Sequence, residues 1–196
     1  MIRQVMLALS AMTGAAAQGQ QPPSFAADEP DPVAVRIMDV YARCAVAHNA
    51  KRAARIVETD YRSADYQPAL RSFALDERSC VPRAGKLKFK PVVFAGLMAE
   101  ELLRRRHVDV GALKDAQTPA EPNGFVACVI KTESLKVSAL FLTAPASLAE
   151  KKAISPLTRA AVDCLPRDQV PLTNMVIFRA ELALVSYQFA KRDGLV

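Results

Sequence analysis

The sequence predicts an all-helical protein built from two tandem, disulfide-bridged repeats of four helices each, packed with pseudo-twofold symmetry. Three observations support this. An offset of 84 residues aligns two halves of the chain without a gap, and it places Cys44 on Cys128 and Cys80 on Cys164. The 196 residues include no tryptophan and only seven glycines, and alanine and leucine, both good helix formers, are abundant. Apolar residues also recur at helical spacing along both halves.

The repeat is most visible in the pattern Cys-x-Pro-Arg, which occurs at 80–83 and again at 164–167. Internal repeats are sought first because a missed period misassigns the whole fold. Duplication of a structural unit explains the pattern without a ligand: the proline stops a helix, the arginine bonds the exposed carbonyls at its end, and the cysteine holds it in place. The alternative is that Arg83 and Arg167 form paired ligand clamps.

The first 33 residues are not expected to belong to either repeat. Residues 1–17 resemble a signal peptide, with Arg3, a short apolar stretch and small residues at a cleavage site. Residues 18–33 are rich in proline and are expected to form a disordered linker. No later apolar run reaches the roughly 18 residues that a membrane span requires. We therefore expect a periplasmic or secreted protein, with repeat 1 at 34–110 and repeat 2 at 111–196.

Four cysteines in an exported chain predict two disulfides. Three pairings can be drawn, and the repeat selects Cys44–Cys80 and Cys128–Cys164 because a duplicated unit keeps its own bridge. A zinc site is the alternative, but zinc ligands usually include closely spaced cysteine pairs, and these cysteines lie far apart in a chain with two histidines. We expect no metal and no cofactor.

The first repeat shows four helical patterns and a short basic stretch. Asn49 is a suitable cap for the second helix because its side chain can accept a hydrogen bond from the next turn. The alternation of basic and apolar residues over 86–90 favours extended chain. The helices are expected at about 34–47, at about 50–58, around Leu70 and Phe73 with an end at Cys80, and after Pro91.

The second repeat follows the same plan after a connection at 107–122. Ser147 and Glu150 have the spacing of a capping box, and Pro156 is expected to kink or split the helix that they begin. Thr173 or Asn174 is expected to cap the last helix. The helices are expected around Cys128, at about 134–142, from Ser147 to Cys164, and at about 174–190.

The chain lacks the common catalytic motifs, including the G-x-S-x-G elbow, the phosphate-binding G-x-x-x-x-G-K and the zinc-binding H-E-x-x-H. His48 and His107 have no partner that the sequence identifies, and a general base needs one. Glu100 and Glu101 point about 100° apart on a helix, so we expect both on the surface, paired with arginines four residues later. No catalytic residue is predicted.

Positive charge is concentrated in the first repeat, where 15 Lys and Arg face 9 Asp and Glu, against 10 and 8 in the second. If these groups share a face, they attract anions such as lipid headgroups, lipopolysaccharide phosphates or an acidic protein. An exported protein is not expected to meet nucleic acid. The candidate anion-binding residues are Arg83, Lys86, Lys88, Lys90, Arg104, Arg105, Arg106 and Arg167.

A set of positions resembles a group of exported proteins from alphaproteobacteria, of sphingomonad type, that have no assigned activity. The positions are Cys44, Cys80, Pro82, Leu87, Phe89, Phe94, Ala99 and Glu100, with Cys128, Cys164 and Pro166 in the second repeat. The second repeat departs from the group by having Leu184 where the acid should follow Ala183. The resemblance implies a helical fold and export only.

The sequence thus favours an exported helical scaffold or adaptor that binds a protein or an envelope component and performs no catalysis. The first alternative is a carrier or binder of an anionic amphiphile such as a lipid, suggested by alanine-rich helices beside a basic cluster. The second is a hydrolase whose site has no familiar motif. A pocket in which His48 or His107 contacts a serine or a carboxylate would favour that alternative.

Overall fold

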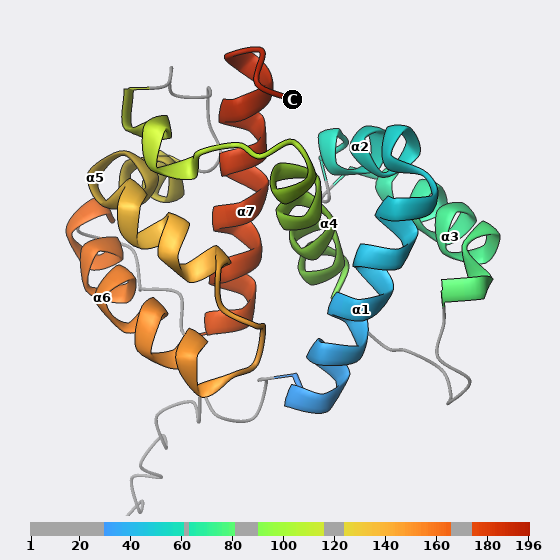
Figure 1. Ribbon diagram of the computed structural model, residues 1–196, viewed down its shortest axis with the longest axis horizontal. Helices are drawn as coiled ribbons and strands as arrows, with labels where there is room; N and C mark the ends of the chain where they lie inside the picture. The colour runs from blue at the N-terminus through green and yellow to red at the C-terminus, as the bar shows by residue number, and fades with distance from the viewer. Residues whose placement is uncertain (1–29, 61–62, 81–89, 116–123, 166–173) are drawn as a thin grey trace, which may run out of the picture.

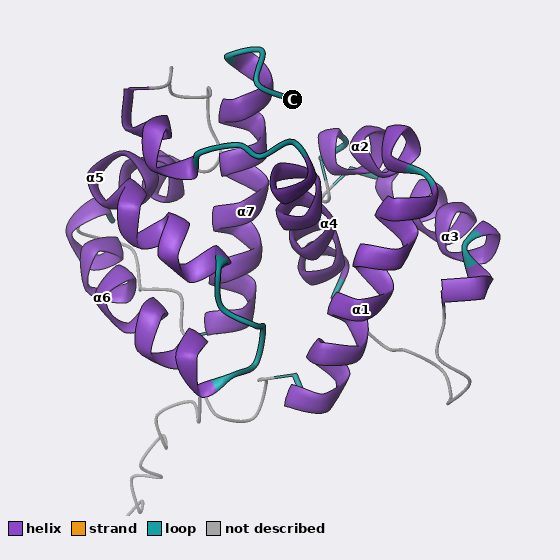
Figure 2. Ribbon diagram, in the orientation of Figure 1, coloured by secondary structure: helices purple, strands orange, loops and turns teal. Residues whose placement is uncertain are grey.

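A computed structural model describes residues 30–60, 63–80, 90–115, 124–165 and 174–196, and within these residues every regular element is a helix (Figure 2). The predicted all-helical class is therefore confirmed. Residues 1–17 and most of the expected linker lie outside the described residues. The elements are α1 (Pro32–His48), α2 (Ala50–Glu58), α3 (Tyr66–Asp76), η2 (Arg78–Cys80), α4 (Pro91–Arg105), η3 (Val110–Asp115), α5 (Gly124–Phe141), α6 (Leu148–Cys164) and α7 (Met175–Arg192).

Helices α4 and α7 lie side by side at the centre of the molecule, with α1, α2 and α3 on one side and α5 and α6 on the other (Figure 1). Both central helices are buried over most of their circumference, as expected for helices that are enclosed by others. Their closest approach is at Gly96, where an added Cβ would lie 2.4 Å from the Cα of Ala180. The two backbones thus touch at a position where a side chain on α4 has no room.

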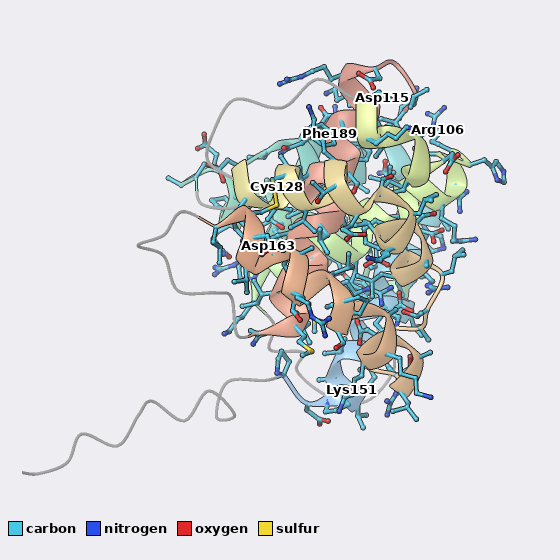
Figure 3. The ribbon with its side chains drawn as sticks, turned by 90° about the vertical axis from the view of Figure 1, so that its left-hand side faces the viewer. Arg106, Asp115, Cys128, Lys151, Asp163 and Phe189 are labelled. Carbon is cyan, nitrogen blue, oxygen red and sulfur yellow. A yellow bond between two sulfur atoms is a disulfide. The ribbon has the colours of Figure 1, made fainter. Side chains whose placement is uncertain are left out.

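Both predicted disulfides are present. Cys44 is bonded to Cys80 and Cys128 to Cys164, with Cα–Cα distances of 5.6 and 5.8 Å. The first bridge joins α1 to η2, and the second joins α5 to the end of α6 (Figure 3). Two disulfides are compatible with a compartment outside the cytoplasm. None of the helices in the described part of the chain is both long and hydrophobic enough to cross a membrane.

The caps that the sequence predicts are formed. Asn49 accepts a hydrogen bond from the backbone N–H of Arg52 at 3.2 Å, and Asn174 accepts one from Ile177 at 3.1 Å. Ser147 accepts from the N–H of Glu150 at 3.1 Å, while the Glu150 carboxylate accepts from the N–H of Ala146 at 2.6 Å. These side chains satisfy N–H groups that have no partner within their helix.

Three boundaries differ from the prediction. Helix α1 begins at Pro32, inside the expected linker, because Asp31 caps it by accepting from the N–H of Val33 at 2.9 Å. Helix α3 ends at Asp76, and Cys80 lies in η2 instead. The connection expected at 107–122 contains the short helix η3.

Two proline and junction effects also differ. Helix α6 continues through Pro156, so the expected split does not occur. Proline leaves the carbonyl of Lys152 without its helical donor, but Lys152 is exposed and water can replace that donor. The two helices expected around Cys128 and at 134–142 form one element, α5, interrupted only by the non-helical backbone of Glu133 (φ −130°, ψ 31°).

Several boundaries repeat at the offset of 84 residues. Helix α4 begins at Pro91 and α7 at Met175. Helix α2 begins at Ala50, directly after Asn49, and the second part of α5 follows Glu133, the counterpart of Asn49. Gly96 and Ala180, which touch across the centre, are also 84 positions apart.

Candidate ligand-binding site

A pocket of about 630 Å³ lies between α2, the C-terminal end of α4 and α7. Four cationic side chains line it: Lys51 and Arg55, one turn apart on α2, and Arg105 and Arg106 from the end of α4 and its C-cap. All four residues are exposed. Guanidinium groups bind carboxylate and phosphate oxygens through paired hydrogen bonds, so this pocket has the donors that an anion requires.

The pocket also contains one described carboxylate, Glu58, which is already engaged. The Lys191 ammonium lies 2.5 Å from its Oε2, and the Tyr187 hydroxyl donates to its Oε1 at 3.4 Å. Burial, reinforced by the charge of Glu58, raises the pKa of Tyr187 to about 12. The phenol therefore stays protonated at neutral pH and remains a donor to Glu58, which leaves the four cations available to a ligand.

The rest of the lining is apolar. Leu102 of α4 is 5% exposed, and Ala50, Ala54 and Val196 are partly buried beside it. An apolar floor below a basic rim suits an amphiphile, because the apolar part leaves water while the headgroup keeps its ionic contacts.

The structure separates the predicted anion-binding residues. Lys90 precedes the first residue of α4, and the three arginines follow its last turns. A helix of 15 residues is about 22 Å long, so Lys90 and the arginines do not form one site. Arg104 donates to Glu101 at 2.8 and 2.7 Å and lies outside the basic pocket. Arg83, Lys86, Lys88 and Arg167 lie outside the described residues.

Lys51 and Arg55 are the members of the pocket that the sequence analysis missed. Their four-residue spacing places them on one face of a helix, and that spacing is a usable signal. The sequence could not show that this face lies beside the end of α4, about 50 positions later.

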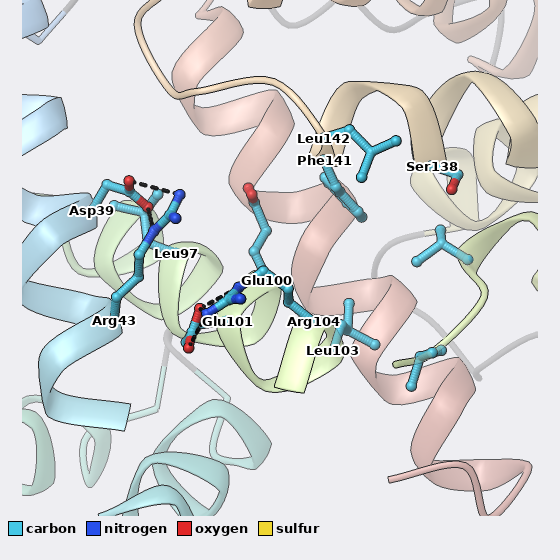
Figure 4. Close-up of a pocket in the computed structure, with 12 residues that line it drawn as sticks. Asp39, Arg43, Leu97, Glu100, Glu101, Leu103, Arg104, Ser138, Phe141 and Leu142 are labelled. Carbon is cyan, nitrogen blue, oxygen red and sulfur yellow. Dashed lines mark hydrogen bonds and ion pairs between the residues drawn. The ribbon is translucent and has the colours of Figure 1, made fainter. Parts of the chain in front are cut away.

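A second, smaller pocket of about 120 Å³ lies between α1, α4 and α5 (Figure 4). Its charged residues are paired with one another: Arg43 Nη2 lies 2.9 Å from Asp39 Oδ2, and Glu101 accepts from Arg104. Its apolar wall includes Phe141 and Leu142, and Leu142 is 88% exposed. These ion pairs leave little free charge, so the basic pocket is the better candidate for a charged ligand.

Glu100 belongs to a buried ionic cluster and not to the surface, so the predicted pairing with Arg104 is wrong. The guanidinium of Arg179, which is 3% exposed, donates to both Glu100 oxygens at 2.7 Å and to Glu150 Oε1 at 3.0 Å. It also bonds Thr143 through the hydroxyl and the carbonyl.

Burial sets the charge balance of this cluster. It raises the pKa of Glu100 even though Arg179 is adjacent. Burial alone would lower the pKa of Arg179, but attraction to Glu100 and Glu150 outweighs it and raises that pKa. The surface prediction is wrong for Glu101 too: that residue is 3% exposed, although it does lie 3.7 Å from Arg105, four residues later.

The two histidines have different surroundings. His107 is exposed and has a positive φ of 53° after the end of α4. His48 ends α1, and its Nδ1 lies 3.2 Å from Glu77 Oε2. The other recorded contacts of His48 are the two sulfurs of the Cys44–Cys80 bridge. The imidazole–carboxylate pair thus exists, but within the described residues its neighbours are disulfide sulfurs and not a hydroxyl nucleophile.

No protein family, curated protein or solved structure matches this chain. The resemblance to alphaproteobacterial exported proteins stays a prediction.

Proposed function

We propose that this protein is an exported, non-catalytic binding protein that holds an anionic amphiphile of the cell envelope, with the headgroup in the basic pocket. The observation that supports it best is the convergence of Lys51, Arg55, Arg105 and Arg106 over an apolar floor. This proposal narrows the expected scaffold function to one envelope component. The exposure of the four cations makes the binding sensitive to salt, because exposed charges are screened.

Comparison of the two halves supports the same pocket. At the offset of 84, the counterparts of Lys51 and Arg55 are Leu135 and Ala139, and those of Arg105 and Arg106 are Phe189 and Ala190. Phe189 and Ala190 are fully buried. The two repeats, in this proposal, are related by a pseudo-twofold axis at the contact of Gly96 with Ala180, and only the first repeat carries the charged site.

Vesicle binding tests the proposal. The chain should bind phosphatidylglycerol vesicles at low salt and should not bind phosphatidylcholine vesicles. The variant R55E/R106E should bind the anionic vesicles at least about tenfold more weakly, a change of about 1.4 kcal/mol. The matched control is K151E/R159E, which makes the same change in net charge at two exposed positions of α6, away from the pocket (Figure 3).

Equal losses in the two variants would show diffuse charge attraction and would contradict a specific pocket. Failure of the wild-type chain to bind anionic vesicles would contradict the lipid proposal itself. The protein adaptor would then be the remaining hypothesis, with Leu142 (88% exposed) and Leu148 (70% exposed) as its candidate contact residues.

A further inference from the structure

Four side chains with metal-binding or acid–base chemistry meet at the Cys44–Cys80 bridge. His48 lies one turn after Cys44 on α1, with its Nε2 4.0 Å from Cys44 Sγ. Its Nδ1 lies 3.6 Å from Cys80 Sγ and 3.2 Å from Glu77 Oε2. The ligand atoms of Cys44, His48 and Cys80 are all within 4.8 Å of one another. The fold thus assembles a ligand set that the spacing of the cysteines in the sequence does not suggest.

Burial shows a built arrangement with one open side. Cys80 is 7% exposed, and the Glu77 side chain is 10% exposed and faces the imidazole. The His48 side chain is 50% exposed, so an ion or a water molecule can approach from solvent.

The second bridge lacks this arrangement. At the offset of 84, His48 corresponds to Thr132 and Glu77 to Ala161. The Thr132 hydroxyl donates to backbone carbonyls of its own helix, those of Cys128 and Val129. A bridge that serves only to hold two helices together needs neither the imidazole nor the carboxylate, as Cys128–Cys164 demonstrates.

We propose that Cys44, His48 and Cys80 bind Zn²⁺ when the two cysteines are thiols, and that formation of the disulfide releases the ion. Two thiolates and one imidazole are a common zinc ligand set, with water in the fourth position. In the metal-bound form, His48 binds through Nε2, and Glu77 positions the ring by accepting from Nδ1–H, a pattern typical of zinc-bound histidine. The two sulfurs then lie about 3.8 Å apart, as for ligands at 2.3 Å from a tetrahedral ion.

Release of the ion follows from thiol–disulfide exchange with a donor that carries a disulfide. One protein sulfur attacks a donor sulfur, the donor S–S bond breaks, and a mixed disulfide forms. The second protein sulfur then attacks the first, which forms the Cys44–Cys80 bond and expels the other donor sulfur as a thiolate. The protein sulfurs lose two electrons, the donor gains two, the donor thiolates take up protons from water, and Zn²⁺ leaves because disulfide sulfurs are poor ligands.

Zinc binding to the full chain after reduction by a phosphine tests this inference. The phosphine takes its oxygen from water and leaves two protons on each opened pair of sulfurs, and it contributes no thiol ligand. Variant C128S/C164S retains only the first pair and should bind one Zn²⁺ by native mass spectrometry. Variant C44S/C80S retains only the second pair and should bind none. Reoxidation of C128S/C164S should release the ion.

Two single variants separate a metal site from a structural pair. In reduced C128S/C164S, H48Q and E77Q should each weaken zinc binding at least about tenfold, the lower limit for loss of a residue that supports a metal ligand. Co²⁺ should give a thiolate charge-transfer band that H48Q alters. Circular dichroism checks the helices, and if reduction loosens them, Zn²⁺ should restore them in C128S/C164S only.

Equal zinc binding by the two cysteine pairs would overturn the inference, as would no binding by the first pair. Unchanged affinity in H48Q would also overturn it, because the imidazole is then not a ligand. None of these outcomes depends on the basic pocket, so failure here is distinct from failure of vesicle binding.

Discussion

Arg179 is the residue whose environment is most demanding. Its guanidinium lies between two carboxylates from different helices, Glu100 of α4 and Glu150 of α6, and also bonds the α5–α6 connection at Thr143. Burial of charges is costly unless every donor and acceptor is satisfied, and here five hydrogen bonds share one side chain. The cluster fixes α6 and α7 relative to α4.

Substitution of Arg179 by methionine should therefore be strongly destabilising. It leaves Glu100 and Glu150 without their buried cation, and removal of one partner from such a pair costs about 3–5 kcal/mol. Urea denaturation should show this loss in the free energy of unfolding. R159M, at an exposed position of α6, is the control and should change stability by less than about 0.5 kcal/mol; a similar effect in the two variants would refute the role of the cluster.

Sequence patterns identified Glu150 as a capping residue but could not identify its second role. A helical period shows which residues share a face, but not what lies opposite that face. Glu100 looked like a surface residue because Arg104 is four positions away, whereas Arg179 is 79 positions away in the chain and adjacent in space. Ionic partners that are distant in sequence lie beyond the reach of local patterns.

At the scale of elements, prediction succeeded where the cause is local. Asn49, Ser147 and Asn174 cap their helices through bonds to residues two to three positions away, so sequence spacing is sufficient. It failed at Pro156, because whether a helix bends or continues through proline depends on solvent and packing around the freed carbonyl. The close approach of α4 to α7 at Gly96 was likewise not foreseen.

Substitution of Gly96 by alanine should lower the free energy of unfolding by about 1–3 kcal/mol, the usual cost of overpacking. The new Cβ would lie 2.4 Å from the Cα of Ala180 and 2.8 Å from its carbonyl oxygen. The sign is informative, because alanine in place of glycine in a free helix stabilises by about 1 kcal/mol. Thermal and urea denaturation measure it.

The exchanged pair provides the control. G96A/A180G places the larger residue on the other helix, and it should regain at least half of the stability lost in G96A if the two positions are equivalent across the contact. A stabilised G96A variant, or no recovery in the exchanged pair, would contradict this account of the α4–α7 contact.

At the scale of the whole molecule, three tyrosines report on the integrity of the fold. Burial raises the pKa of Tyr66 and Tyr187, and it raises the pKa of Tyr41 with a further contribution from Glu77. Their hydroxyls donate to Pro91 O, Glu58 Oε1 and Ala74 O respectively. They link α3 to α4, α7 to α2, and α1 to α3.

Stability should therefore fall at alkaline pH. A tyrosine pKa raised in the folded state contributes stability below the unfolded value of about 10, and that contribution is lost as pH rises through the folded value. Urea denaturation between pH 9 and pH 12 should show the fall, which Y187F should reduce in the window from about 10 to about 12. Phenolate absorbance at a pH near 10 from all tyrosines, with the helices intact, would contradict it.

The repeat allowed a whole-molecule property, the pairing of the cysteines, to be predicted from the sequence alone. The ligand sites could not be predicted in the same way. The basic pocket combines α2 with the end of α4, and the cysteine, histidine and glutamate cluster combines α1 with the end of α3. Each is made by packing between elements, and composition showed only that the first repeat carries the excess charge.

The contact of Gly96 with Ala180 also limits how the lengths of the two central helices can change. Each helical residue turns the chain by about 100°. One residue inserted upstream of Gly96 in α4 would therefore rotate the glycine away and bring Ala95 against the α7 backbone, while one deletion would bring Leu97 there. Insertions and deletions in this protein should thus accumulate in its connections and spare the first turns of α4 and α7.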